Sequence, residues 1–314
     1  MDPAYSVILF TSSSGAGYGL IAWLALARLT GLWDISPITA LVACLVALIL
    51  ITVGLLSSTF HLGHPERAWR AISQWKSSWL SREGVFAILT YPAALVFTAG
   101  WIWNQITPGM MSIAAAATLV LAVITVISTG MIYASLKTIP RWHNHWVVPV
   151  YLALAAASGG LLFTIALAVS GSASKQSLIT VLAVLLASWA IKWLYWKFID
   201  AQQPESTTGT ATGLGHLGEV TQLEAPHTSE NYLLKEMGFQ VARKHATRLR
   251  RLALNLGLLL PAILLILAGV TSSVAQLALL LIALAFGLTG IVIERWLFFA
   301  EARHAVTLFY GRSL

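Results

Sequence analysis

The stretch PITALVACLVALILITVGLLSSTF, residues 37–60, contains no charged side chain. A helix needs about 20 mostly apolar residues to cross the hydrocarbon core of a bilayer, so this stretch predicts a transmembrane helix. The segment HLGHPERAWR, residues 61–70, follows directly and carries two histidines, one glutamate and two arginines. This abrupt change marks the point at which the chain leaves the membrane.

The composition extends this interpretation to the whole chain. Of its 314 residues, 58% are hydrophobic and only 10% are charged, whereas soluble domains carry about 25% charged residues. The chain is therefore expected to be embedded in a membrane. Its single cysteine, Cys44, excludes an iron–sulfur cluster ligated only by cysteines of this chain.

Apolar stretches of spanning length predict an all-α fold, a polytopic bundle of eight transmembrane helices with both termini on one side. The small residues at 12–19 and 155–160 predict close helix packing. The predicted spans are residues 6–31, 37–60, 84–105, 110–136, 147–170, 176–199, 251–270 and 273–299.

The basic residues predict the orientation of this bundle. Of the 19 lysines and arginines, 17 fall on the side of the termini, and only Arg28 and Lys175 fall on the other side. Because basic residues are retained on the cytoplasmic side, both termini are expected in the cytoplasm. The formal charge of +7 follows this topology, so we do not expect nucleic acid as a partner.

Three regions follow from this topology. Residues 1–200 hold six spans and the cytoplasmic loop 61–83. Residues 201–250 are expected to form a linker and a basic amphipathic helix, which is typical of a helix on anionic membrane lipid and equally of a docking surface for a cytoplasmic partner. Residues 251–314 hold two further spans and the C-terminal tail.

The loop 61–83 gathers ionisable and aromatic side chains beside the bilayer. Pro65 suits the first turn of a short interfacial helix, and SWLSRE, residues 78–83, leads into the third span with Glu83 at its mouth. Ionisable groups at membrane depth are functional candidates, although a solvated basic loop is an alternative. The candidate residues in this loop are His61, Arg67, Arg70, Trp79 and Glu83.

The second unusual segment is IVIERWLFFAEARHAV, residues 291–306, at the end of the last span. Ionisable groups interrupt an apolar helix there, and Phe298 offers a flat apolar wall. We expect this segment to form one pocket with the loop 61–83, although an Arg295 that snorkels to the surface and pairs with Glu294 is an alternative. The candidate residues here are Glu294, Arg295, Phe298 and His304.

A quinone fits these residue types. Histidine, arginine and tryptophan donate hydrogen bonds to its two carbonyl oxygens, and glutamate or histidine exchanges protons with them. Haem b is a less favoured ligand. All eight histidines map to the side of the termini, and the pair His61 and His304 is the remaining candidate for axial ligation.

The segments HLGHPERA, residues 61–68, SWLSRE, residues 78–83, and RWLFF, residues 295–299, resemble the motifs of the membrane-anchor subunits of the dimethyl sulfoxide reductase family. The resemblance covers essentially the whole chain and implies electron exchange with ubiquinone or menaquinone, with His61 at the quinone. It also implies two partners, a ferredoxin-like iron–sulfur subunit and a catalytic subunit that carries molybdopterin guanine dinucleotide.

Two departures from the reductase anchors, the insertion at residues 201–250 and the cytoplasmic orientation, favour one branch of this family. The cytoplasmic orientation, the segment at residues 228–245 and the ending at residues 294–304 are similar to the membrane subunit of sulfite:quinone dehydrogenase. The resemblance therefore implies quinone reduction fed by sulfite oxidation, with the catalytic subunits on the cytoplasmic face. A quinol-oxidising anchor of a dimethyl sulfoxide or polysulfide reductase is one alternative. A solute transporter is another, but it would carry its polar groups near the membrane midplane rather than at one rim.

Overall fold

The structure, a computed structural model, describes residues 3–61, 63–202, 206–224, 241–271 and 273–310. Within these ranges, eight helical segments are long and apolar enough to cross a membrane, which confirms the predicted fold. The spans are α1 (Tyr5–Thr30), α2 (Pro37–Ser57), α3 (Trp79–Ala99), α4 (Pro108–Ala134), α5 (Val147–Val169), α6 (Lys175–Ala201), a seventh span built from three helices, and α11 (Ser273–Ala300).

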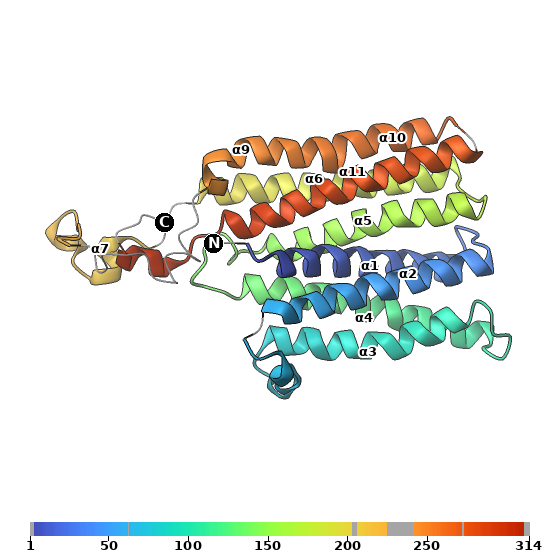
Figure 1. The fold of residues 1–314 in the computed structure, drawn as a ribbon, viewed down its shortest axis with the longest axis horizontal. Helices are drawn as coiled ribbons and strands as arrows, with labels where there is room; N and C mark the ends of the chain where they lie inside the picture. The colour runs from blue at the N-terminus through green and yellow to red at the C-terminus, as the bar shows by residue number, and fades with distance from the viewer. Residues whose placement is uncertain (1–2, 62, 203–205, 225–240, 272, 311–314) are drawn as a thin grey trace.

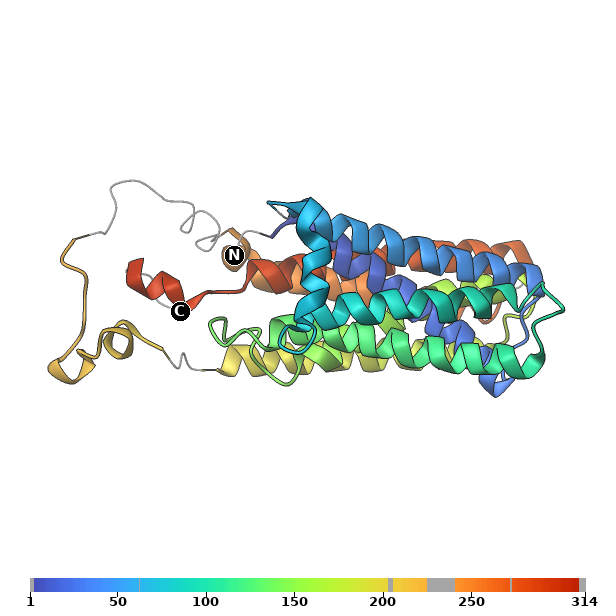
Figure 2. The same ribbon diagram turned by 90° about the horizontal axis from the view of Figure 1, so that it is seen from below.

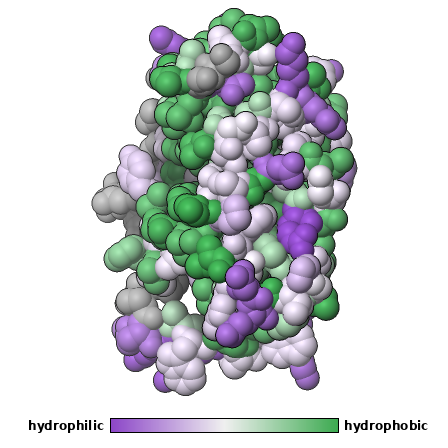
Figure 3. Space-filling model, turned by 90° about the vertical axis from the view of Figure 1, so that its right-hand side faces the viewer, coloured by the Kyte–Doolittle hydropathy of each residue, from purple (hydrophilic) through white to green (hydrophobic). Residues whose placement is uncertain are grey.

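The helices lie side by side, and α1 begins at the same end of the bundle at which α11 ends (Figure 1). We call this the termini-side end. The helix α1 packs on α2, α4 and α5, while α11 packs on α5 and on the seventh span. Apolar side chains mixed with smaller polar areas cover the opposite end (Figure 3).

Several short helices lie at the termini-side end. The η1 helix (Ser58–His61) and the η2 helix (Pro65–Gln74) connect α2 to α3, and η2 runs across the direction of the spans (Figure 2). The predicted short helix that starts at Pro65 is therefore present, as a 3₁₀-helix. The remaining short helices are α7 (Thr208–Thr212), η3 (Gly215–Leu217) and η5 (Ala305–Tyr310).

The small residues at 12–19 and 155–160 allow α1 and α5 to approach closely. A β carbon added at Gly19 would lie 1.9 Å from the carbonyl oxygen of Ala155, and one added at Gly159 would lie 2.1 Å from the carbonyl carbon of Gly19. These distances are far inside van der Waals contact, so glycine is required at both positions. The prediction of close packing is confirmed.

The third span begins earlier than the sequence predicts, at Trp79 rather than at residue 84, and ends at Ala99. The side chain of Ser78 accepts a hydrogen bond from the backbone N–H of Ser81 (3.4 Å) and caps the helix. Glu83 therefore lies inside the span and not at its mouth. Hydropathy alone hides this start because charged residues occupy the first two turns.

The seventh span consists of α9 (Val241–Leu254), the π-helical turn η4 (Asn255–Leu259) and α10 (Leu260–Ala268). The helical segment that is long and apolar enough to cross a membrane includes residues from His245 to Ala268, and the sequence predicts a span over 251–270. Pro261 cannot donate a backbone hydrogen bond, so one bond of the regular α-helix is missing there. The π-helical turn just before it accommodates this missing bond. The predicted basic helix within 201–250 falls partly on residues 225–240, outside the described residues.

Candidate functional site

Glu83 projects from the second turn of α3 into the protein interior, where only 4% of its surface is exposed. The hydroxyl of Thr129 on α4 donates a short hydrogen bond to its Oε1. No Lys, Arg or His of the described part of the chain forms an ion pair with it. Burying a carboxyl group without a cation is costly, which marks this position as a functional candidate.

Arg82, the nearest cation in the sequence, turns away from Glu83. Its Nε and Nη2 donate to the carbonyl oxygens of Trp75 (3.0 Å) and Lys76 (2.7 Å), just after η2. Its guanidinium lies over the ring of Trp79, 4.3 Å from the ring centroid. Arg82 thus stabilises the turn between η2 and α3. It does not pair with Glu83, which points into the protein interior.

A buried group of three charges lies between α6 and α11, and we call Lys192, Glu294 and Arg295 the inner charged cluster. Glu294 forms an ion pair with Lys192 and accepts a hydrogen bond from Nε of Arg295 at 2.5 Å. Lys192 and Glu294 are fully buried, and Arg295 is 2% exposed. The pairing of Arg295 with Glu294 follows the sequence alternative, but neither side chain snorkels to the surface.

This cluster changes the sequence interpretation in two ways. The sequence topology assigns Lys192 to the cytoplasmic rim, yet Lys192 lies nine residues before the end of α6, about 13 Å along the helix. The expectation that the ionisable groups sit only at the rim is therefore wrong. Sequence reasoning missed Lys192 as a site residue, although a lysine inside an apolar span is itself a signal of function.

Phe298 does not present an open wall. Trp142 stacks on its ring at a centroid distance of 5.5 Å and an interplanar angle of 14°. Tyr133, Tyr151 and Phe299 contact the same ring edge-on, at centroid distances of 5.2–5.6 Å. The aromatic cluster fills the space in which a flat ligand was expected.

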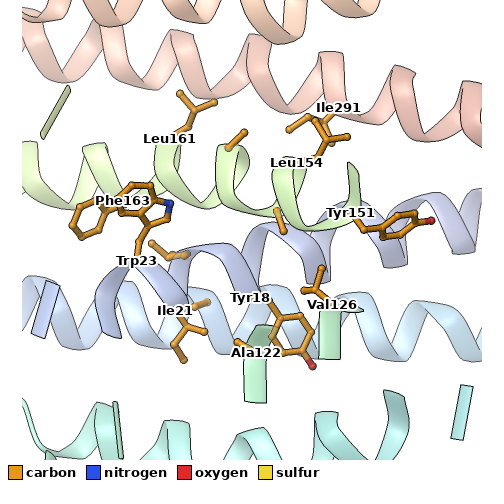
Figure 4. Close-up of a cluster of buried hydrophobic side chains, with 14 of the residues drawn as sticks. Tyr18, Ile21, Trp23, Ala122, Val126, Tyr151, Leu154, Leu161, Phe163 and Ile291 are labelled. Carbon is orange, nitrogen blue, oxygen red and sulfur yellow. The ribbon is translucent and has the colours of Figure 1, made fainter. Parts of the chain in front are cut away.

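A small cavity, lined by both polar and apolar side chains, lies in the termini-side half of the bundle, between α1, α4, α5 and α11. Its volume is about 20 Å³. Tyr18 of α1 and Tyr151 of α5 belong to the layer of buried side chains around it (Figure 4). The polar residues that line it include Ser12, Ser14, Tyr18, Thr129, Tyr151 and Arg295.

Several polar atoms of this cavity have no well-formed hydrogen bond among the described residues. They are Ser12 Oγ, Tyr18 Oη, Tyr151 Oη and Arg295 Nη2. The Arg295 guanidinium lies over the face of the Tyr151 ring, 4.2 Å from its centroid. Thr129 lines the cavity and also holds Glu83, so Glu83 is one hydrogen bond away from a cavity that Arg295 lines.

A second group of charges ties the helix ends together nearer the termini-side surface. Glu301 accepts hydrogen bonds from Arg141 (3.0 Å) and from Arg250 (2.6 and 2.9 Å). Arg250 also pairs with Asp200 at 2.5 Å. These contacts join α11, α9, α6 and the segment before α5. Sequence reasoning recognised the charges but could not pair residues so distant in the chain.

His304 lies just beyond α11. Its Nδ1 accepts a hydrogen bond from the backbone N–H of Val306 (3.0 Å), and burial lowers the pKa of the imidazole. In the neutral ring the proton is then on Nε2. Within the described part of the chain, no group of three or more His, Cys, Asp or Glu side chains is placed to hold a metal ion.

Among the described residues, the two predicted halves of the site come together only in part, because Thr129, which binds Glu83, lines the same cavity as Arg295. Arg67 and Arg70 are exposed on η2, which packs against α3 and η1, while the end of α11 packs on α5 and α9. Trp79 is half-buried at the start of α3. His64 pairs with Glu66 at 3.0 Å. His61 ends η1, and its side chain lies outside the described residues.

Comparisons with known proteins agree with this architecture. The sequence profile of the family described as the DMSO reductase anchor subunit (DmsC) matches residues 1–312. The protein is 34% identical to a sulfite dehydrogenase subunit of Allochromatium vinosum over 99% of both sequences. It is 26% identical to a subunit of the anaerobic dimethyl sulfoxide reductase of Escherichia coli K12, over 53% of this protein and 58% of that one.

No solved structure is significantly similar to this chain. The eight spans, the motif residues that start α3 and the profile match over nearly the full length all agree with the resemblance inferred from the sequence. The chain belongs to the DMSO reductase anchor subunit family of membrane proteins.

Proposed function

We propose that this anchor subunit passes electrons from a sulfite-oxidising catalytic assembly to membrane quinone. The assembly comprises a molybdenum subunit that carries molybdopterin guanine dinucleotide and a ferredoxin-like iron–sulfur subunit. Support comes from the 34% identity, over 99% of both sequences, to a protein named as a subunit of sulfite dehydrogenase. Sulfite and water yield sulfate, two electrons and two protons, and one ubiquinone or menaquinone takes up two electrons and two protons.

The observation that carries quinone reactivity is the buried carboxyl group of Glu83, near the start of α3, the helix that η2 contacts. It lies in the second turn of α3 and has a neutral hydrogen-bond partner in place of a cation. A carboxyl group in such a place is suited to exchange protons with a reduced ligand oxygen. His61, at the end of η1, is the proposed hydrogen-bond donor to the same ligand.

The position of the quinone follows from these two residues. Its head group lies between η1 and the start of α3, next to Trp79, with Arg67 and Arg70 of η2 at the membrane surface. Helix α2 packs on α1 far more extensively than on α3, so the isoprenoid tail leaves between α2 and α3. The hydrogen bond between Thr52 and Tyr91 (2.7 Å) links these two helices nearer their middle.

The catalytic assembly docks on the cytoplasmic face in this proposal. Seventeen of 19 basic residues belong to the termini-side half of the sequence topology, and basic residues favour the cytoplasmic side. Electrons then enter at the same end of the bundle as η1, η2 and Glu83.

Quinol oxidation that feeds a reductase is the second candidate direction. The similarity to the dimethyl sulfoxide reductase subunit favours it, but that similarity covers only 53% of this protein. The relative with the sulfite dehydrogenase name matches almost all of it. We therefore assign quinone reduction to this subunit.

The test uses the intact complex with His61→Ala and Glu83→Gln. With sulfite as electron donor, we expect quinone reduction to fall about 100-fold, since a positioned acid or base contributes about 10²–10⁴ in rate. Reduction of a water-soluble acceptor should persist, because its electrons leave through the partner subunits. The matched control is His64→Ala, because His64 is exposed and pairs only with Glu66. Unchanged quinone reduction in both site variants would refute the assignment.

A further inference from the structure

The cavity between α1, α4, α5 and α11 is too small for a quinone ring. About 10–15 Å³ accommodates one water molecule, so the cavity of about 20 Å³ has room for one or two waters. An apolar cavity of this size would stay dry, but this one is lined by Tyr18, Tyr151 and Arg295, whose Oη, Oη and Nη2 atoms make no well-formed hydrogen bond among the described residues. A water molecule needs two to four polar partners, and Tyr18, Tyr151 and Arg295 supply them.

The charges around the cavity also favour the presence of water in it. The inner charged cluster holds two cations, Lys192 and Arg295, and only one carboxylate, Glu294. One positive charge is thus left over in a buried place, where an unbalanced charge is costly. Glu83 is a second carboxyl group near the cavity, held by the lining residue Thr129.

The cavity also lies close to the aqueous phase. Thr129 is five residues from the end of α4, and Arg295 is five residues from the end of α11. At 1.5 Å per residue, each lies about 7–8 Å below its helix end. A proton therefore has a short distance to travel from the termini-side water to the cavity.

We propose that this cavity is a hydrated chamber that supplies protons to Glu83. The idea rests on the proposed function, because Glu83 must give protons to the quinone. Glu83 donates one proton to a quinone oxygen and is left as a carboxylate. The chamber water passes it a replacement proton taken from bulk water, and two such cycles accompany the two electrons that reduce one quinone. Tyr18, Tyr151 and Arg295 are positioning residues, since they hold the water and touch no reacting atom.

The substitution Gly15→Leu tests the chamber directly. Gly15 lines the cavity, and a β carbon added there meets only the β carbon of Ala155, at 3.9 Å. Leucine is therefore expected to fill the chamber without moving the backbone. Gly109→Leu is the matched control, because Gly109 is exposed at the start of α4 and an added β carbon meets nothing. Tyr151→Phe is a second variant, which removes one water partner and keeps the ring over Arg295.

The measurement is infrared difference spectroscopy of the intact complex, with the Glu83 carboxyl band identified by its loss in Glu83→Gln. In Gly15→Leu we expect exchange of this carboxyl proton for deuterium to slow about tenfold or more, with a similar fall in sulfite-driven quinone reduction. Tyr151→Phe should show a smaller change of the same sign, and Gly109→Leu should match the wild type. Wild-type exchange in both cavity variants would overturn the proposal. Absence of quinone reduction by the wild-type complex would instead overturn the proposed function, and the exchange rates would still test the chamber.

Discussion

Glu294 of α11 holds two cations at once, because its carboxylate pairs with Lys192 of α6 on one oxygen and with Arg295 on the other. All three side chains are buried. Removing one member of a buried ionic group is costly when it leaves a charge without a partner, by about 3–5 kcal/mol. Glu294 and Lys192 therefore differ in their expected contribution to stability. Loss of Glu294 leaves two cations without a partner, whereas loss of Lys192 leaves the pair Glu294–Arg295.

This inequality predicts the stability of two variants. We expect Glu294→Gln to lower the free energy of unfolding by about 3–5 kcal/mol and Lys192→Met to lower it by about 1 kcal/mol or less. Thermal unfolding of the detergent-purified complex measures the difference. Equal losses in the two variants would mean that the cluster does not share one carboxylate between two cations.

The contact between α1 and α5 predicts the effect of a single methyl group. Gly19→Ala places a carbon 1.9 Å from the carbonyl oxygen of Ala155, so the two helices must separate. We expect a loss of about 1–3 kcal/mol, the usual cost of overpacking. Gly109→Ala, where an added β carbon meets nothing, should be neutral. A Gly19→Ala protein as stable as Gly109→Ala would contradict the described approach of α1 to α5.

His304 predicts a pH-dependent loosening of η5. Burial lowers the pKa of His304 in the folded protein, so the unfolded chain binds the proton more readily. The stabilisation is therefore complete above the unfolded pKa of about 6.5 and is lost as the pH falls below it. Hydrogen exchange of the Val306 amide, corrected for its intrinsic rate, should become faster at acid pH.

The matched control for this pH effect is His304→Asn, which keeps a polar side chain but does not titrate. Its Val306 exchange, corrected in the same way, should be independent of pH across the same range. If wild type and His304→Asn respond alike to acid, another group is responsible for the loosening.

The proposed orientation predicts the outcome of reporter fusions. Alkaline phosphatase, which is active only outside the cytoplasm, should be inactive when fused after residue 314 and active when fused after residue 105, between α3 and α4. This expectation follows from the asymmetric distribution of lysine and arginine. Activity at residue 314 and inactivity at residue 105 would invert the bundle and move the proposed docking face to the other side.

Local patterns in the sequence are sufficient to predict the spans. Long uncharged stretches such as residues 37–60 decide a transmembrane helix by themselves, because the bilayer sets both length and polarity. The start of α3 escapes prediction because its first two turns contain Arg82 and Glu83, and hydropathy alone ignores the Ser78 cap. The cap is readable from SWLSRE, since serine is a preferred N-cap residue.

The site is less predictable because its contacts join distant parts of the chain. The candidates Glu83, Glu294 and Arg295 are ionisable residues at membrane depth, and each lies buried. Their partners Thr129 and Lys192 are 46 and 102 residues away in the sequence. No local pattern predicts which helices bring them together. For the same reason, the sequence could not show which members of the loop 61–83 and the segment 291–306 would lie near one cavity, namely Glu83, through Thr129, and Arg295.

The central claim is that this subunit delivers electrons from sulfite to quinone. The most direct measurement is the yield of quinol and sulfate when the purified complex, in liposomes that contain ubiquinone or menaquinone, is supplied with sulfite. We predict one quinol for each sulfate formed. Sulfite oxidation with a soluble acceptor but no quinol formation by the same preparation would contradict the claim.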